Sequence, residues 1–333
     1  MQAILTVTIP FFALVLLGYL AGQRRVLPES AIPGLNAFVL YFALPCMLFR
    51  FGASMPFAKL IDPVLIGIYA LCALLVVALT IALTLQRREG GPGVKLKDAA
   101  FGAFVAAFPN SGFMGVPLLV GLLGDAAAGP VMGTLLVDLF MTSTLCLALA
   151  QAPARRASGD AETSVISSVL RSLRGAATNP QPWAIALGAL FAASGLALPG
   201  PVLQVVKMLG DSATPVALFT IGTVLWRAGQ HAHTRTPLAR YLPVALIKLF
   251  VHPLLVGGVG LAARAAGIQV PAFGLMVLVL AAALPSASGV SLLAERFEAD
   301  NGRVARIIMA STALAFVSFT LIAWGFGARA GSP

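Results

Sequence analysis

Residues 106–112 read Ala106-Ala107-Phe108-Pro109-Asn110-Ser111-Gly112 and interrupt an otherwise apolar segment of helix length. Proline has no N–H and its ring clashes with the preceding turn. The helical hydrogen bond to the carbonyl of Val105 must therefore be lost, and the helix must kink or break. At membrane depth, broken backbone is tolerated only inside protein or beside a cavity. We expect this stretch to lie in such a place.

A second interruption occurs much later, at Ala282-Ala283-Leu284-Pro285-Ser286-Ala287-Ser288-Gly289, again within a long apolar segment. Two interrupted helices in corresponding positions of two halves are typical of a transporter's binding site. Each second half-helix would begin at mid-membrane, with unpaired N–H groups and a positive dipole end that attract anions. The predicted substrate-binding residues are Pro109, Asn110, Ser111, Gly112, Pro285, Ser286, Ala287 and Ser288. The alternative is that both prolines merely kink packed helices.

The composition is that of a polytopic membrane protein. Of 333 residues, 59% are hydrophobic and only 10% are charged, with a mean hydropathy of +0.94, whereas about a quarter of the residues of soluble domains are charged. The net charge of +10 does not indicate nucleic acid, because the basic residues lie between apolar segments rather than in one patch. The three cysteines lie inside apolar segments without metal-ligand spacing. We expect no metal and no cofactor.

Ten apolar segments approach or exceed the roughly 20 residues that cross a bilayer. We expect the first to be a spanning helix and not a signal peptide, because no Lys or Arg precedes it and Arg24-Arg25 follow it. The predicted helices cover approximately residues 3–21, 33–53, 61–86, 98–123, 129–151, 180–198, 203–227, 239–264, 271–296 and 303–327.

The basic residues predict the orientation of these helices. Sixteen of the 22 Lys and Arg residues lie in the loops that follow helices 1, 3, 5, 7 and 9. Cytoplasmic loops carry an excess of Lys and Arg, so these five loops are expected to face the cytoplasm. The N- and C-termini are then both outside.

The only candidate linker divides the chain into two halves of five helices. We expect a first repeat at 1–151, a cytoplasmic linker at 152–179 and a second repeat at 180–333. Because each half has an odd number of spans, a repeat must be inverted in the membrane. Pro45 and Pro215 are 170 positions apart, Pro109 and Pro285 are 176 apart, and the loop residues Asp125 and Asp300 are 175 apart.

Two charged residues lie deep in apolar segments, Asp138 in the fifth and Lys248 in the eighth. Ionisable groups within a membrane are costly unless paired or hydrated, and they often mark function. Asp138 and Lys248 are either a structural ion pair or groups for substrate charge balance or proton coupling. His252, one turn beyond Lys248, is either a proton relay or a buried, hydrogen-bonded histidine.

Four stretches carry a family resemblance: Asn36-Ala37-Phe38-Val39-Leu40-Tyr41-Phe42-Ala43-Leu44-Pro45, Phe108-Pro109-Asn110-Ser111-Gly112-Phe113-Met114-Gly115-Val116-Pro117-Leu118, His252-Pro253 and Leu284-Pro285-Ser286. With these motifs the chain resembles a bacterial member of the auxin efflux carrier family, which includes malonate and malate permease-like proteins. The resemblance implies an all-α protein of ten transmembrane helices in two inverted five-helix repeats, with broken helices 4 and 9 crossing. It also implies a scaffold of helices 1, 2, 6 and 7 and a moving domain of helices 3–5 and 8–10.

We therefore expect a secondary transporter in the bacterial inner membrane that moves small organic anions, usually carboxylates, by an elevator-like, alternating-access mechanism. The resemblance also implies a homodimer, surrounded by membrane lipid. Neither break contains a carboxylate, which favours proton coupling or plain exchange over a dedicated sodium site. The alternatives are an anion channel and an intramembrane serine hydrolase using Ser286 or Ser288, His252 and Asp138. No nucleophile-elbow signature accompanies these serines.

Overall fold

The computed structural model describes residues 2–54, 61–85, 94–158, 170, 174, 175, 177–230 and 236–327. Within these ranges the chain folds into helices joined by short turns. The elements are α1 (Gln2–Gln23), α2 (Ala31–Phe38), η1 (Val39–Ala43), α3 (Leu44–Ala53), α5 (Pro63–Leu85), α6 (Leu96–Ala107), η2 (Ser111–Gly115), α7 (Val116–Leu123), η3 (Asp125–Ala127), α8 (Ala128–Val137), η4 (Asp138–Thr142), α9 (Ser143–Ser158), α11 (Pro180–Ser194), α12 (Gly200–Gln230), α13 (Leu238–Leu246), η5 (Ile247–Val251), α14 (His252–Ala265), α15 (Ala272–Ala282), α16 (Gly289–Arg296) and α17 (Asn301–Gly325).

The described residues contain seven helical segments that are long and apolar enough to cross a membrane. They are Ile4–Gln23, Ala31–Ala53, Pro63–Leu85, Asp125–Ala152, Gly200–Arg227, Leu238–Ala265 and Asn301–Gly325. Predicted helices 4 and 9 are each divided in two. Helix 4 consists of α6 followed by η2 and α7, and helix 9 consists of α15 followed by α16. Predicted helix 6 is the 15-residue helix α11. Most of the predicted linker at 152–179 lies outside the described residues, and α9 continues to Ser158.

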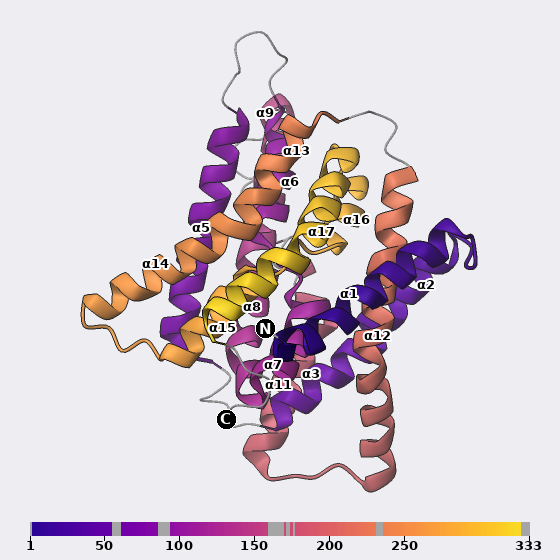
Figure 1. Cartoon of the computed structure of the whole chain (residues 1–333), viewed down its shortest axis with the longest axis vertical. Coiled ribbons are helices and arrows are strands. Elements are labelled where there is room, and N and C mark those ends of the chain that lie inside the picture. The colour runs from indigo at the N-terminus through magenta and orange to yellow at the C-terminus, as the bar shows by residue number, and fades with distance from the viewer. Residues whose placement is uncertain are drawn as a thin grey trace.

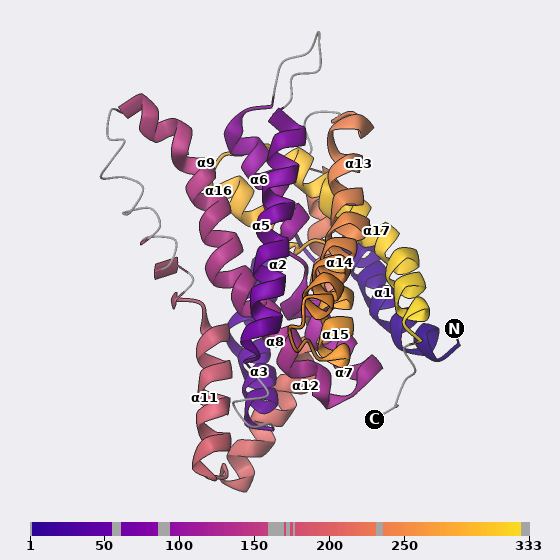
Figure 2. The ribbon, with the colours of Figure 1, turned by 90° about the vertical axis from the view of Figure 1, so that its left-hand side faces the viewer.

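The helices pack in two groups. In one group α1 runs along α12 and α3 runs along α11, whereas in the other α5 packs on α6 and α14 packs on α15. The turn between α11 and α12 lies at the lower end of the molecule, opposite the end where α6 and α13 begin (Figures 1 and 2). The first group contains predicted helices 1, 2, 6 and 7, and the second contains the remaining predicted helices.

Glycines bring the backbones of the first group into direct contact. A Cβ atom at Gly222 of α12 would lie 2.0 Å from the carbonyl oxygen of Val15, and one at Gly18 of α1 would lie 1.9 Å from that of Phe219. The α3–α11 pair shows the same feature, because a Cβ at Gly188 would lie 2.3 Å from the oxygen of Phe49. Small residues at such contacts are typical of helices packed in membranes.

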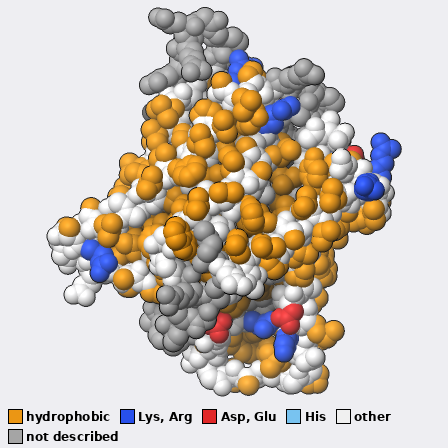
Figure 3. All heavy atoms as spheres, in the orientation of Figure 1, with side chains coloured by type: hydrophobic (Ala, Val, Ile, Leu, Met, Phe, Trp, Pro, Cys, Tyr) orange, Lys and Arg blue, Asp and Glu red, His pale blue; other side chains and the backbone are white. Residues whose placement is uncertain are grey.

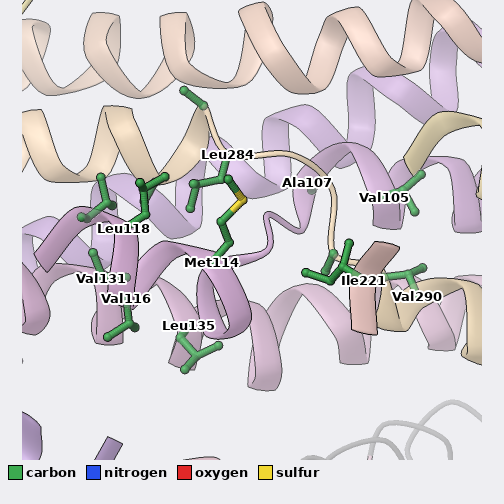
Figure 4. Close-up of a cluster of buried hydrophobic side chains, with 14 of the residues drawn as sticks. Val105, Ala107, Met114, Val116, Leu118, Val131, Leu135, Ile221, Leu284 and Val290 are labelled. Carbon is green, nitrogen blue, oxygen red and sulfur yellow. The ribbon is translucent and has the colours of Figure 1, made fainter. Parts of the chain in front are cut away.

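Apolar side chains cover most of the surface in view, and charged side chains lie towards its edges (Figure 3). Leu16, Leu17 and Leu254 are among the exposed large hydrophobic residues. An exposed apolar surface of this kind is suited to lipid. Beneath it, the apolar core surrounds the two breaks, where Met114 lies against Leu284 (Figure 4).

Within the described residues, four short π-helical turns interrupt the α-helices, and three of them immediately precede a proline-containing turn. After η1, η2 and η5 the next α-helix has proline as its second residue: Pro45, Pro117 and Pro253. The residue before each proline donates its N–H to the carbonyl five positions earlier. The fourth turn, η4, begins at Asp138. Such π turns are frequent at functional sites.

Candidate functional site

The two predicted breaks meet. Pro109 and Ser286 form an isolated antiparallel bridge. The N–H of Asn110 donates to the carbonyl of Pro285 at 2.9 Å, and the N–H of Ala287 donates to that of Phe108 at 3.0 Å. The two donors, Asn110 and Ala287, are 177 positions apart, and so are the two acceptors, Phe108 and Pro285. This spacing is one more than that of Pro109 and Pro285.

Side chains form hydrogen bonds with backbone carbonyl and N–H groups at the breaks. Pro109 leaves the carbonyl of Val105 without its helical donor, and the Ser286 Oγ donates to this oxygen at 2.7 Å. The N–H of Ser286 itself donates to the Ser311 Oγ at 3.2 Å. At the end of α15, the Lys248 Nζ donates to the carbonyl of Ala282 at 2.5 Å. The broken backbone is therefore stabilised inside the protein, as the sequence predicted.

We call the place where the two breaks meet the crossing. Several hydrogen-bond donors there have no partner. Among the described residues, the N–H groups of Gly112, Phe113, Ser288 and Gly289 form no hydrogen bond within the protein. The Ser111 Oγ is likewise buried without a partner. Unpaired N–H groups at helix starts favour negative charge. Backbone from both breaks thus provides donors for an anion.

A cavity of about 580 Å³, the crossing cavity, reaches the crossing. Pro109, Asn110, Gly112 and Ala287 line it from the breaks, together with Gly289. The lining also includes Asn36, Gln151, Gly175, Thr178, Asn179, Gln181 and Arg296. Among the predicted binding residues, Ser111, Pro285, Ser286 and Ser288 do not line this cavity.

Gln181 and Arg296 are two of the cavity residues that sequence reasoning missed. Gln181 of α11 is buried, its Oε1 has no partner, and a Cβ atom added at Gly112 would lie 3.7 Å from this oxygen. Its only signal was an amide placed just after Asn179-Pro180, where the Asn179 Oδ1 caps the Gln181 N–H at 3.0 Å. Arg296 is the one charged side chain of the described lining, and sequence reasoning used it only to predict the orientation of the helices.

Asp138, Lys248 and His252 are all fully buried. The Asp138 carboxylate accepts hydrogen bonds from Tyr69 Oη at 3.0 Å and from Thr142 Oγ1 at 3.2 Å. The Lys248 Nζ lies 3.4 Å from His252 Nδ1 and bonds to Ala282. The direct Asp138–Lys248 ion pair, one of the two sequence alternatives, is not formed, and each side chain has other polar partners. In the described part of the chain the only ion pair is Arg50–Asp211, at 2.6 Å.

The serine-hydrolase alternative receives no support from these contacts. Ser286 Oγ donates to a backbone carbonyl, and Asp138 is held by Tyr69 and Thr142. His252 Nε2 is buried without a partner. The serine, histidine and aspartate thus share no hydrogen bond of the kind that a catalytic triad needs.

A helical membrane protein whose two broken helices cross beside a polar cavity has the architecture of a membrane transporter. The comparisons agree. The chain belongs to the membrane transport protein family, Mem_trans, whose profile matches residues 3–323. This confirms the resemblance to auxin efflux carriers.

Three relatives illustrate the range of this family. The chain is 27% identical to the "Putative malonate transporter" of Rhizobium meliloti, over 96% of this chain and 95% of that protein. It is 24% identical to "Auxin efflux carrier component 8" of Arabidopsis thaliana, over 85% and 86%. It is 25% identical to the "Uncharacterized transporter YfdV" of Escherichia coli, over 93% of both chains.

Proposed function

We propose that the protein is a secondary transporter that moves small organic anions, in particular carboxylates, across the bacterial inner membrane. The observation that carries this proposal is the convergence of unpaired N–H groups from both breaks at one cavity. Gly112 and Phe113 provide them from the first break, and Gly289 from the second. Oriented N–H groups in a site of low dielectric bind anions without requiring a buried lysine.

The substrate carboxylate would accept from these N–H groups and from the side chain of Asn110. Gln181 would contact the substrate from α11, and Arg296 would attract anions towards the mouth of the cavity. A cavity of about 580 Å³ easily accommodates a dicarboxylate. The relative named as a malonate transporter makes malonate the first substrate to test.

We further propose alternating access by an elevator-like movement. The group containing α5, α6, α14 and α15 would move against the group containing α1, α3, α11 and α12. Gln151 and Arg296 belong to the side that the positive-inside rule places in the cytoplasm. The structure would then represent an inward-facing state.

An inverted repeat of residues 1–151 and 180–333 would explain two regularities. Gly18 and Gly188, and likewise Gly52 and Gly222, are 170 positions apart and all lie at close backbone contacts. The hydrogen bonds between the breaks follow the spacing of 177. We also propose that the protein forms a homodimer through the group that contains α1, α3, α11 and α12.

Counterflow in proteoliposomes tests the transport proposal. Vesicles loaded with unlabelled malonate should take up external labelled malonate transiently above equilibrium, and a second dicarboxylate inside should replace malonate. A channel would give flux that neither saturates nor exchanges. Absence of counterflow with malonate and with a panel of dicarboxylates and aromatic acids would contradict the proposal.

A further inference from the structure

A second cavity, of about 290 Å³, lies apart from the crossing. We call it the outer vestibule. None of its lining residues, which include Asp62, Tyr69, Ala126 and Pro271, lines the crossing cavity. Asp62, Ala126 and Pro271 lie at the predicted outer ends of the helices. The crossing cavity is instead lined by Gln151 and Arg296, at the predicted cytoplasmic ends.

The vestibule runs from the surface to a buried hydroxyl group. Ala126 and Pro271 are exposed and Asp62 is half-buried, whereas Tyr69, two turns further along α5, is completely buried. The Tyr69 Oη donates to Asp138 Oδ2 at 3.0 Å. Tyr69 thus separates the vestibule from the buried carboxylate.

Polar groups continue from Tyr69 to the crossing. The rings of Tyr69 and His252 have centroids 5.7 Å apart. His252 Nδ1 lies 3.4 Å from Lys248 Nζ, which donates to the carbonyl of Ala282 at the second break. The other titratable groups that interact with the Tyr69–Asp138 pair are the thiols of Cys72 and Cys146. A change of charge on Asp138 therefore acts on Lys248, because both groups are fully buried and interact electrostatically.

We propose that the outer vestibule gives protons access to Asp138 and that the Tyr69 hydroxyl group passes them to the Asp138 carboxylate. A proton from hydronium in the vestibule binds the Tyr69 Oη while the proton already on Oη moves to Asp138 Oδ2. An O–H bond of hydronium breaks and leaves water as a new O–H bond forms at the tyrosine, and the original tyrosine O–H bond breaks as an O–H bond forms at the carboxylate. Tyr69 therefore ends neutral, and Asp138 becomes a neutral carboxylic acid.

This route deepens the proposed transport function and rests on it. The substrate would use the crossing cavity, and the proton would use the vestibule. Protonation of Asp138 removes a negative charge near Lys248, whose ammonium group holds the end of α15 through Ala282. Proton binding would in this way change the stability of the crossing that binds the substrate.

Tyr69→Phe tests the role of the hydroxyl group because it keeps the buried ring. In proteoliposomes, uphill malonate uptake driven by an inward proton gradient should slow by about tenfold or more, since a positioned proton-transfer group is typically worth at least that much. Malonate counterflow at equal pH on both sides should stay within about twofold of the unmutated rate, because no net proton transfer is needed. Tyr241→Phe, outside the vestibule, is the matched control and should change neither rate.

The outcomes distinguish this inference from the transport proposal. If Tyr69→Phe keeps full proton-driven uptake while Asp138→Asn loses it, the role of Tyr69 is wrong and proton coupling stands. If Tyr69→Phe loses counterflow as well, Tyr69 is required for transport in general, which also overturns the inference. An unmutated protein that shows counterflow but no proton-driven uptake would refute the vestibule route and leave the transport proposal intact.

A measurement at the rim covers the case in which Tyr69→Phe does not fold. Ala126→Cys places a thiol at an exposed vestibule position. Reaction with a bulky, membrane-impermeant thiol reagent should slow proton-driven uptake and spare counterflow. Complete labelling that changes neither rate would overturn the proposal.

Discussion

Ser286 donates to the backbone carbonyl that Pro109 leaves without a donor. The Ser286 Oγ and the Val105 carbonyl are 2.7 Å apart, and both residues are buried. Ser286→Ala should therefore lower the free energy of unfolding by about 1–3 kcal/mol, the usual cost of a buried polar group left unsatisfied. Thermal unfolding in detergent would measure this loss. Ser318→Ala is the control, because the buried Ser318 Oγ has no partner to lose. Equal midpoints for the two variants would contradict the role given to Ser286.

Asn110 lines the cavity beside the unpaired N–H groups. Asn110→Ala should weaken anion binding by about 1.5–3 kcal/mol, or roughly ten- to a hundredfold, which is the value of one charge-assisted hydrogen bond. The apolar faces of the helices remain intact, so the protein should still fold. Substrate binding by calorimetry and the concentration dependence of counterflow would measure the effect. Unchanged binding and kinetics in a well-expressed variant would exclude Asn110 as a ligand.

The residue-scale predictions succeeded where backbone chemistry dictates the outcome. Proline cannot donate an N–H, so the sequence predicted the loss at Val105 and the position of both breaks. It did not predict that Ser286, 181 positions away, would replace the donor. It also did not predict that Lys248 would bond to Ala282 instead of Asp138. Such partners depend on how distant segments pack, which no local pattern specifies.

At the scale of elements, the sequence predicted the positions of the helices better than the kind of helical turn within them. The sequence predicted no π-helical turns, yet the structure places the prolines at 45, 117 and 253 each just after one. Shifting the hydrogen-bond ladder by one residue there keeps the helix continuous past a residue without an N–H. The hydrophobic pattern is nearly the same for both kinds of turn, so it cannot distinguish them.

The α1–α12 contact depends on the absence of a side chain at Gly222. In Gly222→Ala the new Cβ would meet the Val15 carbonyl oxygen at 2.0 Å, so the two helices must move apart. Overpacking of this kind typically costs about 1–3 kcal/mol, and the rigid backbone leaves little room to relax. Gly258→Ala is the matched control, since its Cβ would meet nothing within 4 Å. It should be neutral or stabilising by up to about 1 kcal/mol.

Thermal midpoints of the two glycine variants in detergent provide the measurement. A marked decrease for Gly222→Ala and none for Gly258→Ala is expected. Two equal midpoints would mean that the α1–α12 contact contributes little to stability.

At the scale of the whole molecule, two cavities on opposite ends approach one polar interior. The crossing cavity reaches Asn110, and the outer vestibule reaches Tyr69. The sequence predicted the polar interior, because prolines and charges are conspicuous in apolar segments. It predicted neither cavity, since each is lined by residues from several helices far apart in the chain.

The orientation of the molecule decides which cavity faces the cytoplasm, and it rests on the distribution of basic residues. Sixteen of the 22 Lys and Arg residues lie in the loops assigned to the cytoplasm. In a variant with Cys46, Cys72 and Cys146 replaced by alanine, Ala126→Cys should react with an impermeant thiol reagent in intact cells. Arg156→Cys should react only after the cells are made permeable. Reaction at 156 and not at 126 in intact cells would invert the topology: the crossing cavity would then open to the outside, and the vestibule could take protons only from the cytoplasm.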